Sequence, residues 1–312
     1  MSSWLNLIII LKLYDHEILI NFAGMKILIS GYSGLLGSEL LMLLSEKKVQ
    51  LFLIGRKKLV KNKNIVFIET NLAEKIDFQK FPKKIDVVIH IAQSPYFRDF
   101  NNFAQDIYAV NTSATFQLAL YAKMAGAKQF IFTSTAGIYS SKNEPITEGE
   151  VINYKVDQGF YIASKLAAEQ LLINFKQFYN IIIFRPFFIY GPLQDKNMLI
   201  PRLINNVKNH DRIDLKGSDG LHINPIYVRD AAKALMAAIG KEESSIYNLA
   251  GPEVVSLRSI ADMIGVQCGE IPTFNVVEPK MTESLVGNID LLSKNLYKPE
   301  ITFKEGLKTF FE

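Results

Sequence analysis

The chain has 312 residues, of which 49% are hydrophobic and 21% are charged, and this composition excludes a mainly disordered protein. The net charge is +4 without an extended basic block, so we expect no nucleic-acid partner. The single cysteine excludes an internal disulfide and is typical of the reducing cytoplasm, and four scattered histidines give no cluster with metal-ligand spacing. We therefore expect a cytoplasmic protein that binds no metal.

The first 24 residues contain a short apolar run at 5–11. A membrane span needs about 20 apolar residues. A secretory signal needs a cationic start, and here the first charge follows the apolar run. We therefore predict an extension of unknown role over 1–24 and no membrane partner.

From Met25 onward, apolar runs alternate with segments of helix length. The runs are rich in Ile, Val and Phe without in-out alternation, which is typical of strands buried on both faces of a parallel sheet. This repetition predicts an α/β fold, a doubly wound parallel sheet of the Rossmann type. We predict strands at 26–30, 50–54, 65–69, 86–91, 129–133 and 181–184, and helices at 34–46, 101–125 and 161–179.

After Pro192 the pattern becomes mixed, with helices predicted at 199–209, 230–240, 256–264 and 303–311. We predict a dinucleotide-binding domain over 25–192 and a smaller mixed C-terminal lobe over 193–312 that mainly binds substrate. Strands of this lobe can return to the first sheet.

Three glycines, Gly31, Gly34 and Gly37, lie in the turn between the first strand and the first helix. Glycines allow a tight turn and a close approach, and the helix N-terminus presents free N–H groups to a pyrophosphate. Alone, this spacing also fits a structural turn. In the first strand-helix unit of an α/β chain it predicts a dinucleotide site.

The residue that usually selects the dinucleotide is an acid about 20 residues after the loop, which holds a ribose without a 2′-phosphate. Here the second strand is followed by Arg56 and two lysines. A guanidinium can pair with a 2′-phosphate, so Arg56 favours NADP, with NAD as the alternative. A solvated surface cluster is the other interpretation.

Tyr161 and Lys165 lie four residues apart, which places both side chains on one face of a helix. Thr135 follows the preceding strand, and ligands bind at the carboxyl ends of strands in open α/β sheets. These three residues form the candidate catalytic site. The alternative is a surface tyrosine and lysine on an ordinary helix.

A series of motifs from Met25 to the C-terminus resembles the extended short-chain dehydrogenase/reductase family, the NAD(P)-dependent sugar-nucleotide epimerases, dehydratases and ketoreductases. The motifs are ILISGYSGLLGSEL at 27–40, DVVIHIA at 86–92, Asn111, FIFTSTAGIYS at 130–140, PITE at 145–148, YIASK at 161–165, RPFFIYGP at 185–192, NPIYVRDAA at 224–232 and YNLAG at 247–251.

The resemblance implies a role for each candidate residue. Tyr161 would be the general acid and base, Lys165 would orient the cofactor ribose and lower the pKa of the tyrosine, and Thr135 would bond the reacting oxygen. The implied cofactor contacts are Gly31, Ser33, Gly34, Leu35, Leu36, Gly37, Arg56, Asn71, Leu72, Ile91, Ala92, Thr133, Tyr161, Lys165 and Pro186, and the implied substrate contacts are Gln93, Thr135, Phe188 and His222.

The sequence departs from the family pattern at three places. Dehydratases of the family carry Asp-Glu after the threonine, whereas this chain has Ala136 and Gly137, which argues against dehydration. Phe188 replaces an asparagine near the substrate phosphates, and Ile223, beside His222, replaces an arginine. Two diphosphate contacts are therefore missing.

We accordingly expect an enzyme that transfers hydride at a secondary alcohol or ketone carbon of a sugar nucleotide or related carbohydrate. It would be an epimerase or a ketoreductase, and Arg56 favours the reductase. One alternative is a reductase of a non-nucleotide carbonyl compound. Another is a non-catalytic dinucleotide-binding sensor or scaffold, against which Thr135, Tyr161 and Lys165 argue. The resemblance also implies a homodimer through the helices at 101–125 and 161–179.

Overall fold

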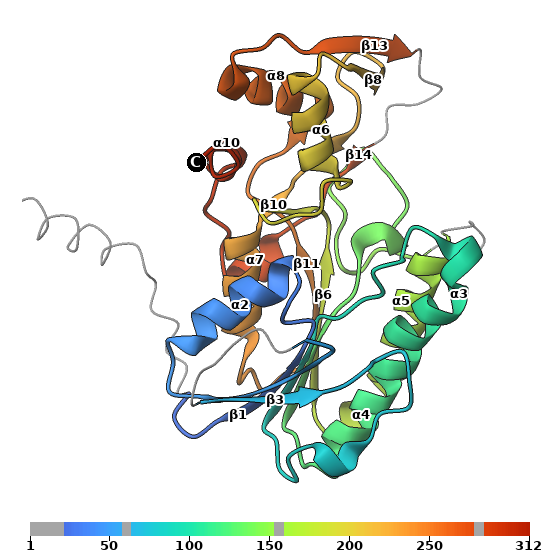
Figure 1. Cartoon of the computed structure of the whole chain (residues 1–312), viewed down its shortest axis with the longest axis vertical. Helices are drawn as coiled ribbons and strands as arrows, with labels where there is room; N and C mark the ends of the chain where they lie inside the picture. The colour runs from blue at the N-terminus through green and yellow to red at the C-terminus, as the bar shows by residue number, and fades with distance from the viewer. Residues whose placement is uncertain (1–21, 58–63, 153–158, 278–283) are drawn as a thin grey trace, which may run out of the picture.

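A computed structural model of the chain describes residues 22–57, 64–152, 159–277 and 284–312 (Figure 1). Its centre is a seven-stranded parallel sheet with the order β11-β6-β5-β4-β1-β2-β3. The order runs outward in both directions from β1 and β4, as in a doubly wound Rossmann-type fold, which confirms the predicted fold class. The strands are β1 Lys26–Ser30, β2 Gln50–Gly55, β3 Ile65–Glu69, β4 Val87–His90, β5 Gln129–Thr133, β6 Asn180–Pro186 and β11 Ser245–Leu249.

Helices cover both faces of this sheet (Figure 1). One face carries α2 and α7, which pack on each other, and the other carries α4 and α5. Because both faces are covered, the central positions of the strands are mostly apolar, which explains the apolar runs in the sequence. The helices are α2 Leu35–Ser45, α4 Ala114–Met124, α5 Phe160–Ile173 and α7 Val228–Ala238.

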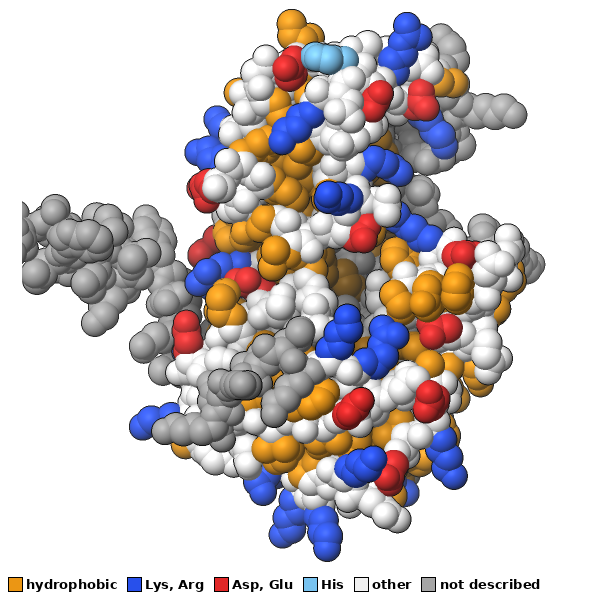
Figure 2. Space-filling view, viewed as in Figure 1, with side chains coloured by type: hydrophobic (Ala, Val, Ile, Leu, Met, Phe, Trp, Pro, Cys, Tyr) orange, Lys and Arg blue, Asp and Glu red, His pale blue; other side chains and the backbone are white. Residues whose placement is uncertain are grey.

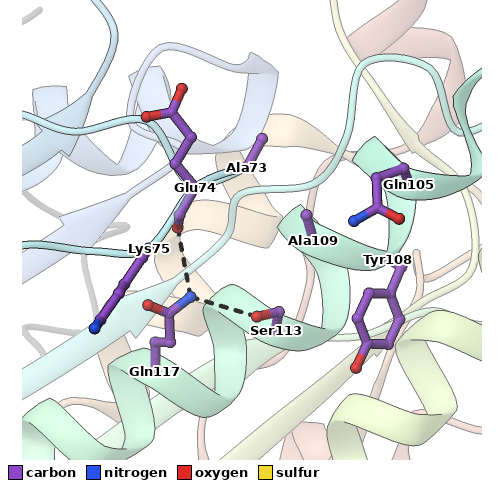
Figure 3. Close-up of a pocket in the computed structure, with 8 residues that line it drawn as sticks. All are labelled: Ala73, Glu74, Lys75, Gln105, Tyr108, Ala109, Ser113 and Gln117. Atoms are coloured by element: carbon purple, nitrogen blue, oxygen red, sulfur yellow. Dashed lines mark hydrogen bonds between the residues drawn. The ribbon is translucent and has the colours of Figure 1, made fainter.

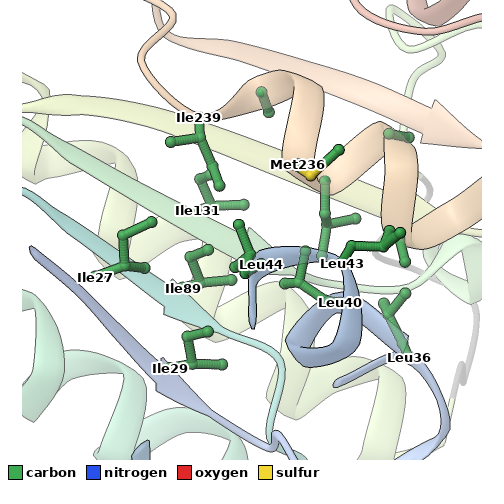
Figure 4. Packing of buried hydrophobic residues seen from close by; sticks show 14 of the residues in the cluster. Ile27, Ile29, Leu36, Leu40, Leu43, Leu44, Ile89, Ile131, Met236 and Ile239 are labelled. Atoms are coloured by element: carbon green, nitrogen blue, oxygen red, sulfur yellow. The ribbon is translucent and has the colours of Figure 1, made fainter. Parts of the chain in front are cut away.

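The core under α2 and α7 shows how the sheet fixes the first helix (Figure 4). Leu40 and Leu44 of α2 are fully buried and lie over Ile29 and Ile89 of the sheet. Positions four apart lie on one face of a helix, so this stripe presses α2 flat against the strands. The packing holds the N-terminus of α2 at the end of β1, where the glycine turn lies.

The predicted helix 101–125 is wrong as a single helix. The structure has α3 Phe100–Tyr108, a π-helical turn Ala109–Ser113 and then α4, and Phe103 leaves helical geometry at φ −127°. A π turn inserts an extra residue into the helical repeat, so it changes which side chains face inward. Here the fully buried Asn111 lies in that turn. The predicted helix 161–179 also ends early, at Ile173, before a 3-10 turn Asn174–Gln177.

The C-terminal lobe has its own core, to which Leu203, Ile213, Ile260 and Phe303 contribute. It lies beyond the carboxyl ends of the strands, and the surface is hollowed between it and the sheet domain (Figures 1 and 2). The later part of the chain also returns to the main sheet through β11 and α7. The remaining elements are α6 Leu199–Lys208, α8 Leu257–Cys268, α9 Asp290–Asn295, α10 Phe303–Lys308, β7 Ile189–Tyr190, β8 Arg212–Lys216, β9 His222–Ile223, β10 Ile226–Tyr227, β12 Val255–Ser256, β13 Thr273–Val277, β14 Ser284–Leu285 and the 3-10 turns Phe78–Lys80 and Ala136–Ile138.

The N-terminal extension lies mostly outside the described residues. Its last part does not: Phe22 is 6% exposed and belongs to the core under α2 and α7. Phe22 therefore packs with the core of the sheet domain. Within the described ranges, no helix combines the length and the apolar character needed to cross a membrane.

Candidate functional site

The glycine turn after β1 has the geometry of a backbone cradle. Gly31 has φ +79°, and a Cβ there would lie 2.5 Å from the amide nitrogen of Ala92. A Cβ at Gly37 would clash with the carbonyl oxygen of Gly31. Gly34 is the N-cap of α2, without a side chain to cap the helix. The first N–H groups of α2 thus remain available, as binding of a pyrophosphate requires.

The other predicted cofactor residues in this turn differ in exposure. Ser33 is exposed, Leu35 is half-buried and Leu36 is buried. Leu36 therefore serves the core, and Ser33 is accessible to a ligand.

Arg56 follows β2 and is exposed. The buried Tyr32, from the glycine turn, donates a hydrogen bond to the backbone carbonyl of Lys57 and packs under Gly55. This contact fixes the segment that carries Arg56 beside the glycine turn. After β3, Asn71 and Leu72 begin the next turn; Leu72 is buried, and the Asn71 amide bonds Glu74 at 2.5 Å.

The ends of β4 and β5 supply the centre of the site. Ile91 and Ala92 follow β4 and are half-buried. Thr133 ends β5, and its hydroxyl and that of Ser134 are buried without a hydrogen-bond partner within the described residues. Buried hydroxyls without partners are rare in proteins, so these two atoms are free to bind a polar ligand.

The candidate catalytic side chains converge next to these hydroxyls. The Tyr161 hydroxyl donates to Gln93 Oε1 at 2.9 Å, and the buried Lys165 ammonium donates to the Thr133 carbonyl at 2.9 Å. Thr135 interacts with Tyr161 and caps the 3-10 turn that follows it, accepting from Gly137 N at 3.1 Å. The structure therefore brings Thr135, Tyr161, Lys165 and the predicted substrate residue Gln93 together.

Burial shifts the pKa values of Tyr161 and Lys165 in opposite directions. Burial raises the pKa of Tyr161 to about 12, and the Thr135 hydrogen bond only partly opposes this rise. Burial lowers the pKa of Lys165 to about 7, and the Glu169 carboxylate opposes that shift. Tyr161 thus holds its proton at pH 7.

The segment 94–98, directly after Gln93, contacts Tyr161 through Phe97. Phe97 packs on the Tyr161 ring, with ring centroids 5.2 Å apart. Arg98 lies over Phe97 and donates to the carbonyl of Asn197, next to the start of α6, at 2.8 Å. This hydrogen bond joins the segment 94–98 to the C-terminal lobe.

The other predicted substrate residues are not brought to this group by hydrogen bonds. Phe188 is half-buried between the lobe core and the small core around Ile138, and Ile223 is fully buried. His222 is half-buried in β9, between β12 and β14. Pro186 is half-buried at the end of β6, beside β11. Ile223 therefore cannot make the phosphate contact of the family arginine.

Asn111, which the sequence analysis named only as a motif residue, connects two parts of the site. Its side chain accepts from Ser94 N at 2.9 Å and donates to Ser164 Oγ at 3.0 Å, while Ser164 Oγ donates to the Tyr161 carbonyl at 2.7 Å. Asn111 thus joins the Gln93 segment to the Tyr161 helix. The signal in the sequence was a polar residue within the apolar stretch of a predicted helix.

A second unforeseen group is the buried ion pair between Glu169 and Arg185. Arg185 Nε and Nη2 donate to the two Glu169 oxygens at 3.1 and 2.7 Å, and Arg185 also donates to the Tyr139 hydroxyl at 2.7 Å. Glu169 lies one turn after Lys165 on α5. The detectable signal was the spacing of Lys165 and Glu169, four residues apart.

A pocket of about 310 Å³ lies elsewhere, between the turn after β3 and the segments α3 and α4 (Figure 3). Gln117 lines this pocket and connects two of its sides: the Gln117 amide nitrogen lies 3.5 Å from the Glu74 carbonyl oxygen and 3.4 Å from Ser113 Oγ. The lining contains none of the candidate catalytic residues. In the part of the chain that the structure describes, no three His, Cys, Asp or Glu side chains are placed to hold a metal ion.

Several known proteins are similar to this chain over most of its length. The model of the NAD dependent epimerase/dehydratase family matches residues 27–250. An uncharacterised UDP-glucose epimerase of Bacillus subtilis, YtcB, is 27% identical over 308 residues, covering 91% of this chain and 96% of the relative. A GDP-6-deoxy-D-talose 4-dehydrogenase of Aggregatibacter actinomycetemcomitans is 28% identical, covering 70% and 71%.

Among solved structures, the UDP-glucuronic acid 4-epimerase of Bacillus cereus in complex with NAD superposes with a TM-score of 0.79 at 26% identity. The superposition covers 92% of this chain and 96% of that one. The family match extends from the second residue of β1 to the residue after β11, so it includes nearly the whole parallel sheet and every candidate catalytic residue. The chain therefore belongs to the NAD dependent epimerase/dehydratase family and is an enzyme of the extended short-chain dehydrogenase/reductase type.

Proposed function

We propose that this enzyme moves hydride at a secondary alcohol or ketone carbon of a sugar nucleotide, with Tyr161 as the proton-transfer group. The observation that carries the proposal is the Tyr161 hydroxyl, held by Gln93 and Thr135 beside Lys165 at the carboxyl ends of β4 and β5. A bound nicotinamide dinucleotide would supply the hydride acceptor and donor. The glycine cradle and the unpartnered hydroxyls of Thr133 and Ser134 fit such a ligand.

The residues of the chain then have distinct tasks. Tyr161 holds a proton at its hydroxyl, the form that protonates the oxygen of a ketone as the carbon is reduced. Thr135 hydrogen-bonds the same oxygen and orients it. Lys165 lies one turn from Tyr161 on the same helix face, where a ribose hydroxyl can replace the Thr133 carbonyl as its partner. In the oxidation direction the base must be the phenolate form of Tyr161, which takes the proton of the alcohol as hydride leaves the carbon.

Two epimerase relatives support the substrate class, because their names contain UDP-glucose and UDP-glucuronic acid. Phe188 and the buried Ile223 favour a second candidate, a carbonyl compound without a nucleotide, because neither side chain can bind a diphosphate. Dehydration is not proposed, since Ala136 and Gly137 offer no carboxyl group.

For the net reaction we propose epimerisation, in which hydride leaves and returns within one turnover. The names of two relatives that match most of the chain support this choice, and Arg56 supports a reductase that consumes NADPH. Purified protein is expected to interconvert UDP-glucose or UDP-glucuronic acid with its 4-epimer without a net change in nicotinamide absorbance. Stoichiometric oxidation of NADPH with a keto sugar would contradict epimerisation and support the reductase.

For the dinucleotide we propose NADP, on the exposed guanidinium of Arg56 at the end of β2. Arg56→Asp is expected to weaken NADP binding by about tenfold or more and NAD binding much less, because it removes a phosphate partner and adds a repelling charge. Lys128→Asp, at the far end of the sheet, is the control for net charge. Equal affinities of the unmodified protein for the two dinucleotides, measured by calorimetry, would contradict the preference.

We also propose a homodimer through the outer face of α4 and α5. Phe116, Leu120 and Met124 lie four residues apart on α4 and are 41%, 37% and 66% exposed, and Leu171 of α5 is 43% exposed. Such an apolar stripe fits a second copy of the same helices. Leu120→Glu is expected to convert a dimer to a monomer in light scattering, and a monomeric unmodified protein would contradict the interface.

A further inference from the structure

His90 is the last residue of β4 and is fully buried, yet both of its ring nitrogens have partners. Nδ1 lies 2.5 Å from Ser30 Oγ, and Nε2 lies 2.9 Å from Thr115 Oγ1. Thr115 donates its own proton to the Asn111 carbonyl at 2.7 Å, so its oxygen can only accept from the ring. The proton is therefore on Nε2, and Nδ1 accepts from Ser30.

These bonds form one directed chain. The Ser30 hydroxyl donates to His90, His90 donates to Thr115, and Thr115 donates to the backbone of the π turn. Ser30 ends β1 and immediately precedes Gly31, the first residue of the glycine turn. One end of the chain therefore lies at the candidate dinucleotide cradle.

The other end lies at the candidate catalytic group. The side chain of Asn111, in the same π turn, bonds both the Ser94 amide and Ser164 Oγ. Ser94 follows Gln93, which accepts from the Tyr161 hydroxyl, and Ser164 bonds the Tyr161 carbonyl. The π turn thus orients the tyrosine from two sides.

We propose that His90 is a positioning residue that couples the glycine turn after β1 to the orientation of Tyr161 through Ser30, Thr115 and Asn111. The assignment of Tyr161 rests on the proposed function, whereas the coupling itself rests only on the hydrogen bonds. A displacement of the glycine turn would move Ser30 and be transmitted through buried bonds, which have no water to compensate for their loss.

The surroundings of His90 keep its ring neutral, as the chain requires. Burial and then the charge of Lys165 lower the pKa of His90 to about 3. Phe132 stacks on the His90 ring with centroids 5.6 Å apart, and the Lys165 ammonium lies 4.9 Å from the same Phe132 ring. A protonated ring would carry two donors and could no longer accept from Ser30. The neutral ring preserves the direction of the chain over the whole physiological pH range.

The coupling can be measured without turnover, by hydrogen exchange of the Ser94 amide in the full chain. Ser30→Ala removes the first donor, and this change is expected to speed exchange of the Ser94 amide by about tenfold, because Asn111 loses its fixed orientation. Ser38→Ala is the matched control, since the Ser38 hydroxyl donates to the Leu35 carbonyl at the start of α2 and the substitution leaves the backbone bonds in place. That control is expected to leave the Ser94 exchange rate unchanged.

A second series separates positioning from folding. Thr115→Val keeps the shape but removes the hydroxyl, and is expected to lower kcat about tenfold, because a small misplacement of a catalytic group is costly, with the dinucleotide Kd nearly unchanged. Thr115→Ser restores the hydroxyl and is expected to restore kcat. The double variant of Ser30→Ala and Thr115→Val should be no worse than the more damaged single variant, because both break one chain.

Unchanged Ser94 exchange in both Ser30→Ala and Thr115→Val would overturn the coupling. Multiplicative losses of kcat in the double variant would also overturn it, since independent effects multiply. If Tyr161→Phe retained full activity, the proposed function would fail, but a tenfold change in Ser94 exchange would still support the chain. Where Thr115→Val does not fold, Ser30→Ala with its Ser38→Ala control decides the question.

Discussion

Tyr161→Phe is expected to lower turnover by about 10² to 10⁴, the usual contribution of general acid-base catalysis, while the dinucleotide affinity changes by about threefold or less. The phenyl ring can keep its packing on Phe97, but no hydroxyl remains to exchange a proton with the substrate oxygen. Steady-state kinetics with a UDP-sugar, together with dinucleotide titration by fluorescence, measures both quantities.

Tyr121→Phe provides the matched control for this variant. Its hydroxyl donates to the Pro82 carbonyl at 2.8 Å, in the core between α4 and the sheet, so its loss removes a hydrogen bond without touching the site. The control is expected to keep its kcat. Full activity in Tyr161→Phe would remove the tyrosine from the mechanism, and an equal loss in both variants would assign the effect to folding.

Glu169→Gln is expected to lower the free energy of unfolding by about 3 to 5 kcal/mol, because it leaves the Arg185 charge buried without a countercharge. Glu169 is fully buried and the Arg185 side chain is 5% exposed, so water cannot replace the lost carboxylate. The variant also removes the charge that opposes the lowering of the Lys165 pKa, so more of Lys165 becomes neutral near pH 7. Urea denaturation followed by circular dichroism measures the stability change.

A surface ion pair gives the comparison for this stability experiment. Lys80 and Asp77 lie 3.9 Å apart with both side chains more than half exposed. Lys80→Gln should therefore change the free energy of unfolding by less than about 1 kcal/mol. A loss of the same small size in Glu169→Gln would show that the buried pair does not hold α5 against β6.

The parallel sheet could be predicted because its strands are buried on both faces and their sequences are continuously apolar. Edge strand β11 differs, because it contains Ser245 and Asn248 among its five residues. It also joins the sheet only after the chain has passed through part of the lobe. Phe22 packs on the core although the apolar pattern starts at Met25. Neither assignment follows from local periodicity, since both depend on long-range packing.

The candidate catalytic residues could be proposed from the sequence because Tyr161 and Lys165 lie four residues apart on one helix and Thr135 follows a strand. The contacts that hold these residues in place could not be predicted. The π turn that buries Asn111 reads as an ordinary helix, because Ala109–Ser113 contains no Gly or Pro that would mark a break. The Arg185 partner lies on a different element, sixteen positions earlier, and only the fold brings the two together. The raised pKa of Tyr161 likewise depends on burial, which the motif does not contain.

The most direct test of the account is the fate of the hydrogen on the reacting sugar carbon. UDP-glucose and UDP-glucuronic acid labelled with deuterium at C4 are incubated with the full-length protein and its dinucleotide in ordinary water, and the products are analysed by NMR. Hydride transfer predicts a 4-epimer that retains the deuterium, at a rate that Tyr161→Phe reduces at least about a hundredfold. Loss of the label to water, or epimerisation at an unchanged rate in Tyr161→Phe, would contradict it.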